Sequence, residues 1–136
     1  VTFEFTHSRN IIMGDLHSNN VYFDGKMVSI FDWNGGLKFK PDSVKLDFPS
    51  GPHHLMPPES KKGNVHRTVS GMDIWTVGLL LDTLIDSFNY YSTADTTDDD
   101  PIHAQITDLR DLMLTHDPYE RPDATELLRH DFFAPE

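Results

Sequence analysis

The chain has 136 residues, the size of one ordinary domain, with 38% hydrophobic residues, a net charge of −11 and no cysteine. The hydrophobic content excludes a disordered chain, the negative charge argues against nucleic acid or acidic membranes as partners, and the missing cysteine excludes disulfides. The N-terminus has no basic region, and the longest apolar run, 77–81, is too short to cross a bilayer. The sequence therefore predicts one domain without a targeting or membrane segment. Its location stays unknown, with the cytoplasm as the default.

Three short strands are predicted in the first part of the chain, at residues 10–13, 21–23 and 26–31. The dipeptide Asp24-Gly25 between the last two is a strong signal for a hairpin turn. Residues 34–59 follow, with many Gly, Pro, Ser and His residues and weak periodicity, which indicates a long loop. Long loops in compact domains tend to carry function, so this segment is a candidate part of a site.

The next segment, residues 70–88, is predicted to be a helix with apolar side chains in every direction. A helix of this kind is expected at the centre of a core. A polar, acidic connection leads to a second helix over 103–115, whose pattern is amphipathic. Its predicted inward face holds Ile106, Leu109, Leu112 and Met113.

A last short helix is predicted to begin at Asp123. An Asp at the N-cap with Glu126 three residues later forms a capping box, and Leu127 and Leu128 are expected to face inward. Taken together, the elements predict a mainly α domain, a helical bundle around a central buried helix with one small β-hairpin.

Residues 10–20, with the sequence N-I-I-M-G-D-L-H-S-N-N, resemble the catalytic loop of protein kinases, whose usual pattern is H-R-D-L-x-x-x-N. The resemblance makes Asp15 the catalytic aspartate and makes Asn20, five residues later, a ligand of Mg²⁺ in the nucleotide site. At these places a carboxylate orients the substrate hydroxyl, and an amide oxygen reaches the metal across a tight loop that Leu16 anchors.

Three residues of this loop depart from the protein-kinase pattern. Met13 replaces His, Gly14 replaces Arg, and His17 stands where most Ser/Thr kinases carry a Lys that touches the transferring phosphate, so His17 is a second candidate catalytic residue. The string Gly-Asp-Leu-His-x-x-Asn also resembles aminoglycoside and choline kinases, which work without that Lys. The structural alternative is a polar loop after a strand, with Asp15 as a turn residue.

The segment I-F-D-W-N at 30–34 resembles the D-F-G motif, whose aspartate binds Mg²⁺. The resemblance assigns Asp32 to metal and nucleotide binding, while Trp33 replaces Phe and Asn34 replaces Gly. Asn tolerates positive φ better than most residues, so the backbone turn is expected to survive at Asn34. The alternative is a strand that ends in an Asp that caps a turn.

Two aromatic residues of the predicted hairpin match nucleotide-site positions in the same alignment. Tyr22 and Phe31 fall where kinases place floor residues of the adenine pocket. The alternative, which we favour for the isolated chain, is that both are ordinary core aromatics of the hairpin.

Three further motifs complete the resemblance in the second half of the chain. M-P-P-E at 56–59 resembles A-P-E, D-I-W-T-V-G at 73–78 resembles D-x-W-S-x-G, and D-P-Y-E-R-P at 117–122 resembles D-P-x-x-R-P. Aminoglycoside kinases have none of these. The chain, residues 1–136, is therefore similar to the C-terminal lobe of a protein kinase domain, with the N-terminal lobe absent.

This resemblance implies two buried polar contacts and a reaction. Glu59 and Arg121 are expected to form an ion pair, and Asp73 is expected to accept backbone N–H groups of the catalytic loop. The full-length parent is implied to transfer phosphoryl groups from ATP, with Mg²⁺, to Ser or Thr hydroxyls of a protein substrate. The isolated fragment is expected to be inactive, because it carries no Gly-rich loop and no strand Lys for the phosphates.

The rival interpretation is a pseudokinase that acts as a binding scaffold or allosteric partner. Retention of Asp15, Asn20 and Asp32 together favours the enzyme. The departures that favour the scaffold are Met13, Gly14, His17, Trp33, Asn34 and Pro52.

Overall fold

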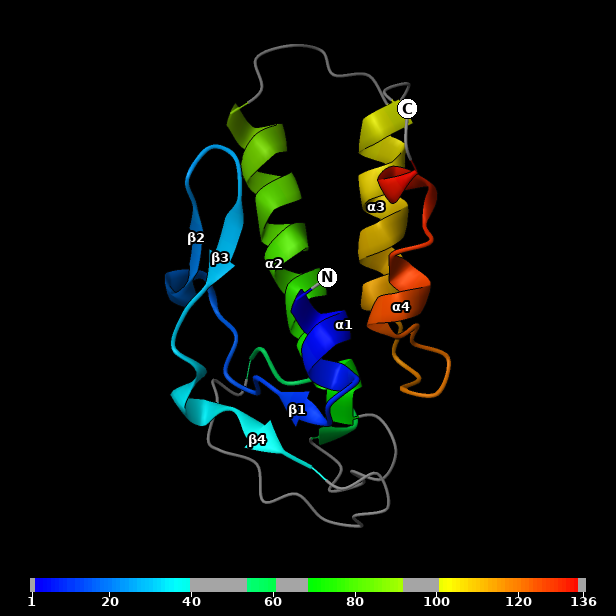
Figure 1. Cartoon of the computed structure of the whole chain (residues 1–136). Helices are drawn as coiled ribbons and strands as arrows, with labels where there is room; N and C mark the ends of the chain where they lie inside the picture. The colour runs from blue at the N-terminus through cyan, green and yellow to red at the C-terminus, as the bar shows by residue number, and fades with distance from the viewer. Residues whose placement is uncertain (1, 40–53, 61–68, 92–100, 135–136) are drawn as a thin grey trace.

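A computed structural model describes residues 2–39, 54–60, 69–91 and 101–134 (Figure 1). Within these ranges the chain is mainly helical, as predicted, with small two-stranded sheets beside the helices. The helices are α1 (Thr2–His7), α2 (Val69–Tyr91), α3 (Pro101–Met113) and α4 (Ala124–Leu127). No helix in the described ranges has the length and apolar content needed to cross a membrane.

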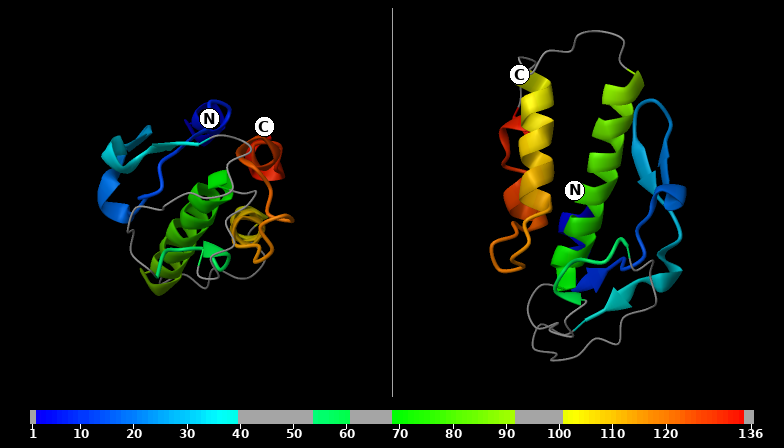
Figure 2. Two further views of the ribbon diagram at one scale, coloured as in Figure 1. Left: turned by 90° about the horizontal axis from the view of Figure 1, so that it is seen from below. Right: turned by 180° about the vertical axis from the view of Figure 1, so that it is seen from behind.

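The two long helices lie side by side and run in opposite directions (Figures 1 and 2). The short helices α1 and α4 flank this pair, and the strands lie on the side of α2 away from α3. The core between the helices combines apolar side chains from α2, α3 and α4. Its buried members are Ile74, Leu109, Met113, Ala124 and Leu127.

The expectation that α2 is buried all round is wrong for its C-terminal half. Met72, Ile74 and Trp75 are buried, but Leu84 is 65% exposed and Phe88 is 57% exposed. The buried core cluster takes Ile74 from α2, and Val77 and Leu81 pack against it, so the described core meets the N-terminal half of the helix.

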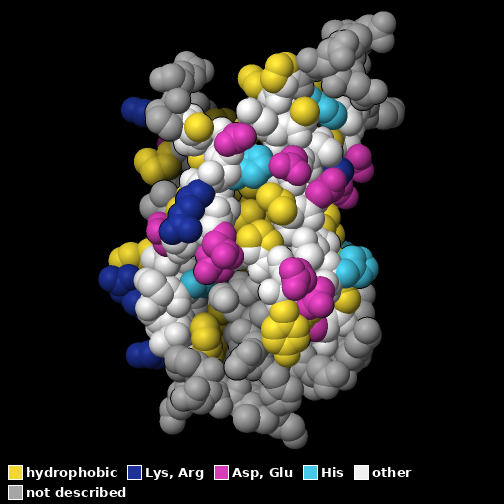
Figure 3. Space-filling view, turned by 90° about the vertical axis from the view of Figure 1, so that its right-hand side faces the viewer, with side chains coloured by type: hydrophobic (Ala, Val, Ile, Leu, Met, Phe, Trp, Pro, Cys, Tyr) yellow, Lys and Arg dark blue, Asp and Glu magenta, His cyan; other side chains and the backbone are white. Residues whose placement is uncertain are grey.

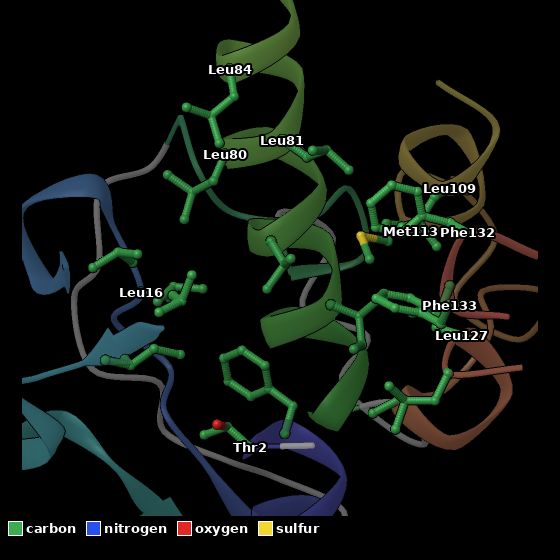
Figure 4. A pocket seen from close by; sticks show the side chains of 18 residues that line it. Thr2, Leu16, Leu80, Leu81, Leu84, Leu109, Met113, Leu127, Phe132 and Phe133 are labelled. Carbon is green, nitrogen blue, oxygen red and sulfur yellow. The ribbon is translucent and has the colours of Figure 1, made fainter. Parts of the chain in front are cut away.

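An apolar groove of about 490 Å³ borders α2 (Figure 4). Leu80, Leu81 and Leu84 of α2 line one wall, and Thr2 of α1 and Leu16 of the predicted catalytic loop also contribute. Because these leucines line an open groove, they remain accessible although the sequence pattern predicts a helix that is buried all round. The candidate catalytic and metal-binding side chains do not line it.

The strands form two antiparallel pairs. In one sheet β1 (Ile11–Ile12) pairs with β4 (Leu37–Lys38), and in the other β2 (Val21–Phe23) pairs with β3 (Val28–Ile30). The strand β4 lies in the segment predicted to be a loop. Its two residues are too few to give a periodic signal, and pairing with β1 supplies the hydrogen bonds that define it.

The predicted hairpin is present, but its connection is longer than the Asp24-Gly25 pair alone. The strand β3 begins at Val28, not at Lys26, because the Asp24 carboxylate accepts N–H bonds from Lys26 at 2.8 Å and Met27 at 2.7 Å. The N–H groups of Met27 and Lys26 also lower the pKa of Asp24. Gly25 has φ +91°, which a residue with a Cβ rarely adopts.

The last two helices agree with the predicted pattern except at one position. Leu109 and Met113 are buried, whereas Leu112 is exposed, because it lies at the flank of the α3 stripe. The capping box of α4 is confirmed: Asp123 accepts the N–H of Glu126 at 2.8 Å, and the Glu126 carboxylate accepts the N–H of Asp123 at 2.9 Å. Leu127 is buried as expected, and Leu128 is half-buried.

Arg121 and Glu59 form the buried ion pair that the motifs imply. Two guanidinium nitrogens contact the two carboxylate oxygens at 2.7 and 3.1 Å, and the Arg121 side chain has no exposed area. The same guanidinium donates to the carbonyl oxygens of Gly71 and Thr115, each at 3.0 Å, and lies 5.0 Å from the Trp75 ring centroid. One side chain therefore joins residue 59, the start of α2 and the end of α3.

Acidic side chains are spread over the face that α3 and α4 present (Figure 3). They alternate there with hydrophobic and histidine side chains and do not gather into one patch.

We expect Glu59→Ala and Arg121→Ala each to lower the free energy of unfolding by about 3 kcal/mol, because each leaves a buried charge unpaired. The double variant should cost less than the sum, since neither charge then remains. Urea denaturation of the three variants measures this coupling. Arg110→Ala is the matched control: Arg110 pairs at the surface with Asp82, and its loss should cost less than about 1 kcal/mol. Strict additivity of the first two changes would contradict the prediction.

Candidate functional site

The predicted catalytic loop lies between β1 and β2, and a buried carboxylate of α2 holds its beginning. Asp73 is 1% exposed, and its two oxygens accept the N–H groups of Met13 at 2.9 Å and Gly14 at 3.0 Å. This confirms the contact expected from the motifs. Because both donors are main-chain groups, Asp73 fixes the direction of the backbone just before Asp15.

Two departures from the kinase pattern fit this backbone. Met13 is fully buried, so an apolar side chain suits its position. Gly14 has φ +73°, a left-handed conformation that glycine adopts without the steric cost that a Cβ brings. Both residues therefore fit the backbone that this loop adopts, and neither places a positive charge next to Asp15.

Asn20 closes the other end of the loop. It is 5% exposed, and its amide nitrogen donates to the Asp15 carbonyl at 2.9 Å, while its amide oxygen accepts the N–H of His17 at 3.0 Å. It ends a 3₁₀ turn (Ser18–Asn20), and its own carbonyl accepts the N–H of Phe31 at 2.8 Å. The last bond links the loop directly to the residue before Asp32.

The Asp15 and His17 side chains are half-buried, and they differ from Asn20 in their contacts. In the described ranges, neither the Asp15 carboxylate nor the His17 imidazole makes a hydrogen bond or ion pair with another side chain. Their backbones are fixed by the contacts above, so both side chains are positioned, and the Asp15 carboxylate has no bonded partner among the described residues.

The backbone turn at the second motif is at Asp32, not at Asn34. Asp32 has φ 56° and ψ 62°, whereas Asn34 belongs to the 3₁₀ turn Trp33–Gly35. The expectation of a positive φ at Asn34 is therefore wrong. Asn34 supports the turn in another way, because its amide nitrogen donates to the exposed Asp32 carboxylate at 2.9 Å. Asp is among the few residues that adopt this conformation.

Trp33 is accommodated by a hydrogen bond and an aromatic contact. Its indole N–H donates to the Ile30 carbonyl at 3.1 Å, and its ring lies 6.5 Å from the ring of Phe3 in α1. The larger ring is thus packed against α1, and Asp32 beside it is left accessible.

Tyr22 and Phe31 are not core aromatics of the hairpin, which corrects the favoured alternative. They are 59% and 56% exposed, and their ring centroids lie 6.5 Å apart. Because both rings are partly exposed and Phe31 precedes Asp32, the pair offers an apolar surface to a flat ligand beside that carboxylate.

The oxygen donors near the loop suit a hard cation. In the ranges described, no group of three or more His, Asp and Glu side chains could hold a metal ion. Asp32 supplies a carboxylate, and the Asn20 amide oxygen keeps a second lone pair beyond its bond to His17. Mg²⁺ is commonly bound by one or two protein oxygens together with phosphates and water, and both donors are of the oxygen type that it prefers.

One functional contact was missed at the sequence level. His7 Nε2 lies 2.9 Å from Asp73 Oδ2, at the end of the unpredicted helix α1. Its place before the catalytic-loop motif gives no periodic signal, and only the fold brings it to Asp73.

Comparison with known proteins agrees with this geometry. The sequence model of the family described as protein kinase domain matches residues 1–133 of this chain. The probable serine/threonine-protein kinase PLK of Dictyostelium discoideum is 26% identical over 145 residues, which cover 96% of this chain and 15% of that protein. The probable serine/threonine-protein kinase CCRP1 of Zea mays is 28% identical over 144 residues, covering 95% of this chain and 23% of that protein. The chain thus spans under a quarter of these relatives, and it belongs to the protein kinase domain family.

Proposed function

We propose that residues 1–136 form the C-terminal lobe of a serine/threonine-type protein kinase domain, and that the whole protein transfers the γ-phosphoryl group of ATP to a protein hydroxyl. The observation that carries this proposal is the Asp73 contact with the N–H groups of Met13 and Gly14. These two hydrogen bonds fix the backbone just before Asp15, so the Asp15 side chain extends from a loop that is held in place. Serine/threonine kinase relatives of similar sequence support the substrate class.

Asp15 is the proposed catalytic residue. Its half-buried carboxylate has no partner in the described part of the chain, so it is available to accept the hydrogen of a substrate hydroxyl. His17, two residues later on the same loop, is placed to donate a hydrogen bond to a phosphate oxygen. Asn20 fixes the loop between them by its bonds to the Asp15 carbonyl and the His17 N–H.

Asn20 and Asp32 would hold Mg²⁺, and Tyr22 and Phe31 would contact the adenine of ATP. The metal, when bound, would neutralise charge on the phosphate oxygens. Asp32 is suited to this place because its left-handed backbone and its bond from Asn34 fix the carboxylate. The exposed rings of Tyr22 and Phe31 give the flat base an apolar floor.

A pseudokinase scaffold is the second candidate, and one observation favours it. One Asp32 oxygen and the Asn20 amide oxygen already accept protein hydrogen bonds, from Asn34 and His17. If these bonds persist when nucleotide is present, the site offers the metal fewer lone pairs. The protein would then keep the fold as a binding surface without efficient transfer.

The test of the proposed function is phosphoryl transfer by the full-length protein. We expect Asp15→Asn and Asp32→Asn each to abolish transfer of radiolabel from ATP to a protein substrate, because they remove the proposed hydroxyl acceptor and metal ligand. Asp86→Asn, an exposed change on α2, is the matched control and should leave the rate unchanged. Equal activity of the Asp15→Asn variant and the wild type would overturn the proposal, and no transfer by wild type would favour the scaffold.

The isolated chain of residues 1–136 is expected to show no measurable transfer. The reason is that its sequence has no Gly-rich loop and no strand Lys to hold the phosphates, so nucleotide would bind poorly. The same radiolabel assay on the isolated chain measures this. Label incorporation that disappears in the Asp15→Asn variant would contradict the prediction.

We further expect the full-length protein to work without phosphorylation of the segment between Asn34 and Glu59. A phosphate there is normally ordered by an Arg, but Gly14 beside Asp15 has no side chain and its N–H is bonded to Asp73. The candidate acceptors, Ser43 and Ser50, lie outside the described residues, as does Pro52 of the same segment.

The measurement is the initial rate before and after phosphatase treatment, with Ser43→Ala and Ser50→Ala variants alongside. Unchanged rates are expected. A large loss of rate in either experiment would show that another cation reads the phosphate. Lys38 is then the first candidate, because β4 places it opposite Ile11 at the start of the loop.

A further inference from the structure

A short 3₁₀ turn near the end of the chain, Asp131–Phe133, lies against α3 and carries two aromatic rings. The ring centroids of Phe132 and Phe133 are 5.1 Å apart, and the rings are nearly perpendicular. Both rings line the apolar groove beside α2, at its α3 side (Figure 4). They are 38% and 45% exposed, so they form an edge of the groove that is only partly covered.

One side chain, His130, joins this C-terminal turn to α3. It is the N-cap of the turn, and its Nδ1 accepts the N–H of Phe132 at 3.1 Å. Its Nε2 lies 3.0 Å from a carboxylate oxygen of Asp108 on α3. The imidazole is 11% exposed, whereas the Asp108 side chain is 71% exposed. The ring is thus nearly enclosed, with one bond to the turn and one to the helix.

The two contacts together assign the protonation state of the His130 ring. A main-chain N–H can only donate, so Nδ1 must offer a lone pair to Phe132 and carry no hydrogen. A neutral imidazole then has its hydrogen on Nε2, and the Asp108 carboxylate accepts it. A protonated ring has a hydrogen on both nitrogens, so its Nδ1–H would point at the Phe132 N–H. The observed geometry therefore belongs to the neutral ring.

Protonation would change the two contacts of His130 in opposite directions. The contact with Asp108 becomes an ion pair, but that carboxylate is exposed, and solvent weakens such a pair. The bond to Phe132 is lost, and the turn keeps two main-chain bonds among the described residues, at 2.9 and 3.0 Å. Because 3₁₀ hydrogen bonds have poorer geometry than those of an α-helix, the cap is a large part of what holds the turn.

The other charged and titratable groups around His130 come from α3, from α4 and from its own segment. Among the described residues, Asp108 is the one charged group that contacts the ring. The others are paired elsewhere, exposed, or further along α3. They are Arg110 and Asp111 of α3, which pair with each other, Glu126 of α4, which accepts the Asp123 N–H, the exposed Arg129 and Asp131 on either side of His130, and His103 of α3.

We propose that His130 is a pH-sensitive cap that holds the C-terminal turn against the groove. While its ring is neutral, it keeps Phe132 and Phe133 in place. Protonation, which histidine side chains ordinarily undergo between about pH 8 and pH 5, removes the cap. The turn is then released and its two rings leave the edge of the groove, while the imidazole stays paired with Asp108. None of these residues belongs to the candidate catalytic or metal-binding set, so this device does not depend on the proposed function.

The test is amide hydrogen exchange of the full-length protein, labelled with ¹⁵N at phenylalanine and leucine, at about pH 7.5 and about pH 5.5. The quantity is the protection factor of the Phe132 amide relative to that of the buried Leu109, which removes the intrinsic pH dependence of exchange. In the wild type this ratio should fall about fivefold at the lower pH, because the turn loses its N-cap. An unchanged ratio would overturn the proposal.

The ring of His130 gives a second measurement that needs no variant. The ¹³Cε1 chemical shift reports its protonation, and the Phe132 amide shift should change with the same midpoint, within about 0.3 pH unit. A clearly different midpoint would assign the change at Phe132 to another group, and the proposal would fall. If a variant does not fold, these two midpoints decide.

Two variants separate the cap from the charge. His130→Asn keeps an acceptor that Asn commonly provides at an N-cap, and it does not titrate, so the Phe132 ratio should stay high at both pH values. His130→Gln keeps a donor of similar reach to Nε2 but is not a residue that caps well, so the ratio should be about fivefold low at both. A pH-dependent fall in His130→Asn, or wild-type protection in His130→Gln, would contradict the role of the cap.

The matched control is His103→Gln. It removes the other histidine of α3, the helix that packs against the turn. The fall of the Phe132 ratio between the two pH values should be the same as in the wild type. If the fall disappears in this variant, the response belongs to His103 and the assignment to His130 is wrong.

Exposure of the two rings tests the consequence for the groove. Relaxation of the Phe132 and Phe133 ring protons by a neutral gadolinium chelate should increase at the lower pH in the wild type and stay unchanged in His130→Asn. If the Phe132 amide loses protection while relaxation of the rings stays the same, the rings remain in the groove, and the proposed release is overturned.

Discussion

The candidate site depends on the hydrogen bonds that pair the buried carboxylate of Asp73. A carboxylate at 1% exposure is stable only if donors meet its oxygens, and the chain supplies them from Met13, Gly14 and His7. These donors come from α1 and from the loop after β1, while Asp73 belongs to α2. The requirement to pair one charge therefore brings three segments together, and the loop direction follows from it.

A second buried charge stabilises the same end of α2. Arg121 bonds to Glu59 and to the Gly71 carbonyl, two residues before Asp73, and its guanidinium lies over Trp75. The first turns of α2 are thus fixed by polar contacts on both sides, while the far end of the helix exposes Leu84. We infer that the polar contacts specify where this helix lies. Its apolar residues are buried at some positions and exposed at others, so they specify its place less sharply.

The sequence predicted best the parts that polar motifs determine. The capping box at Asp123 follows from residue types at fixed spacing, whereas the contacts of Asp73 and of Arg121 with Glu59 were implied by the resemblance of the motifs to those of protein kinases. The positive φ at Asp32 was placed at Asn34, because residue preference alone does not say which residue of a turn adopts it. The exposure of Leu84 and of Tyr22 depends on which elements cover them, and a helical wheel or strand pattern carries no such information.

The departures at Met13 and Gly14 weigh less against catalysis than their side chains suggest. Asp73 accepts hydrogen bonds from the main-chain N–H groups of these residues, so its contact with the loop uses neither side chain, and the positive φ at Gly14 suits glycine. Retention of Asn20 also weighs less in favour of catalysis, because its amide has a structural role between Asp15 and His17. The Asp15 carboxylate has no such role in the described part of the chain, and folding alone gives no reason to keep it. Its presence at the end of a loop that buried charges hold in place is therefore the strongest argument for chemistry over scaffolding.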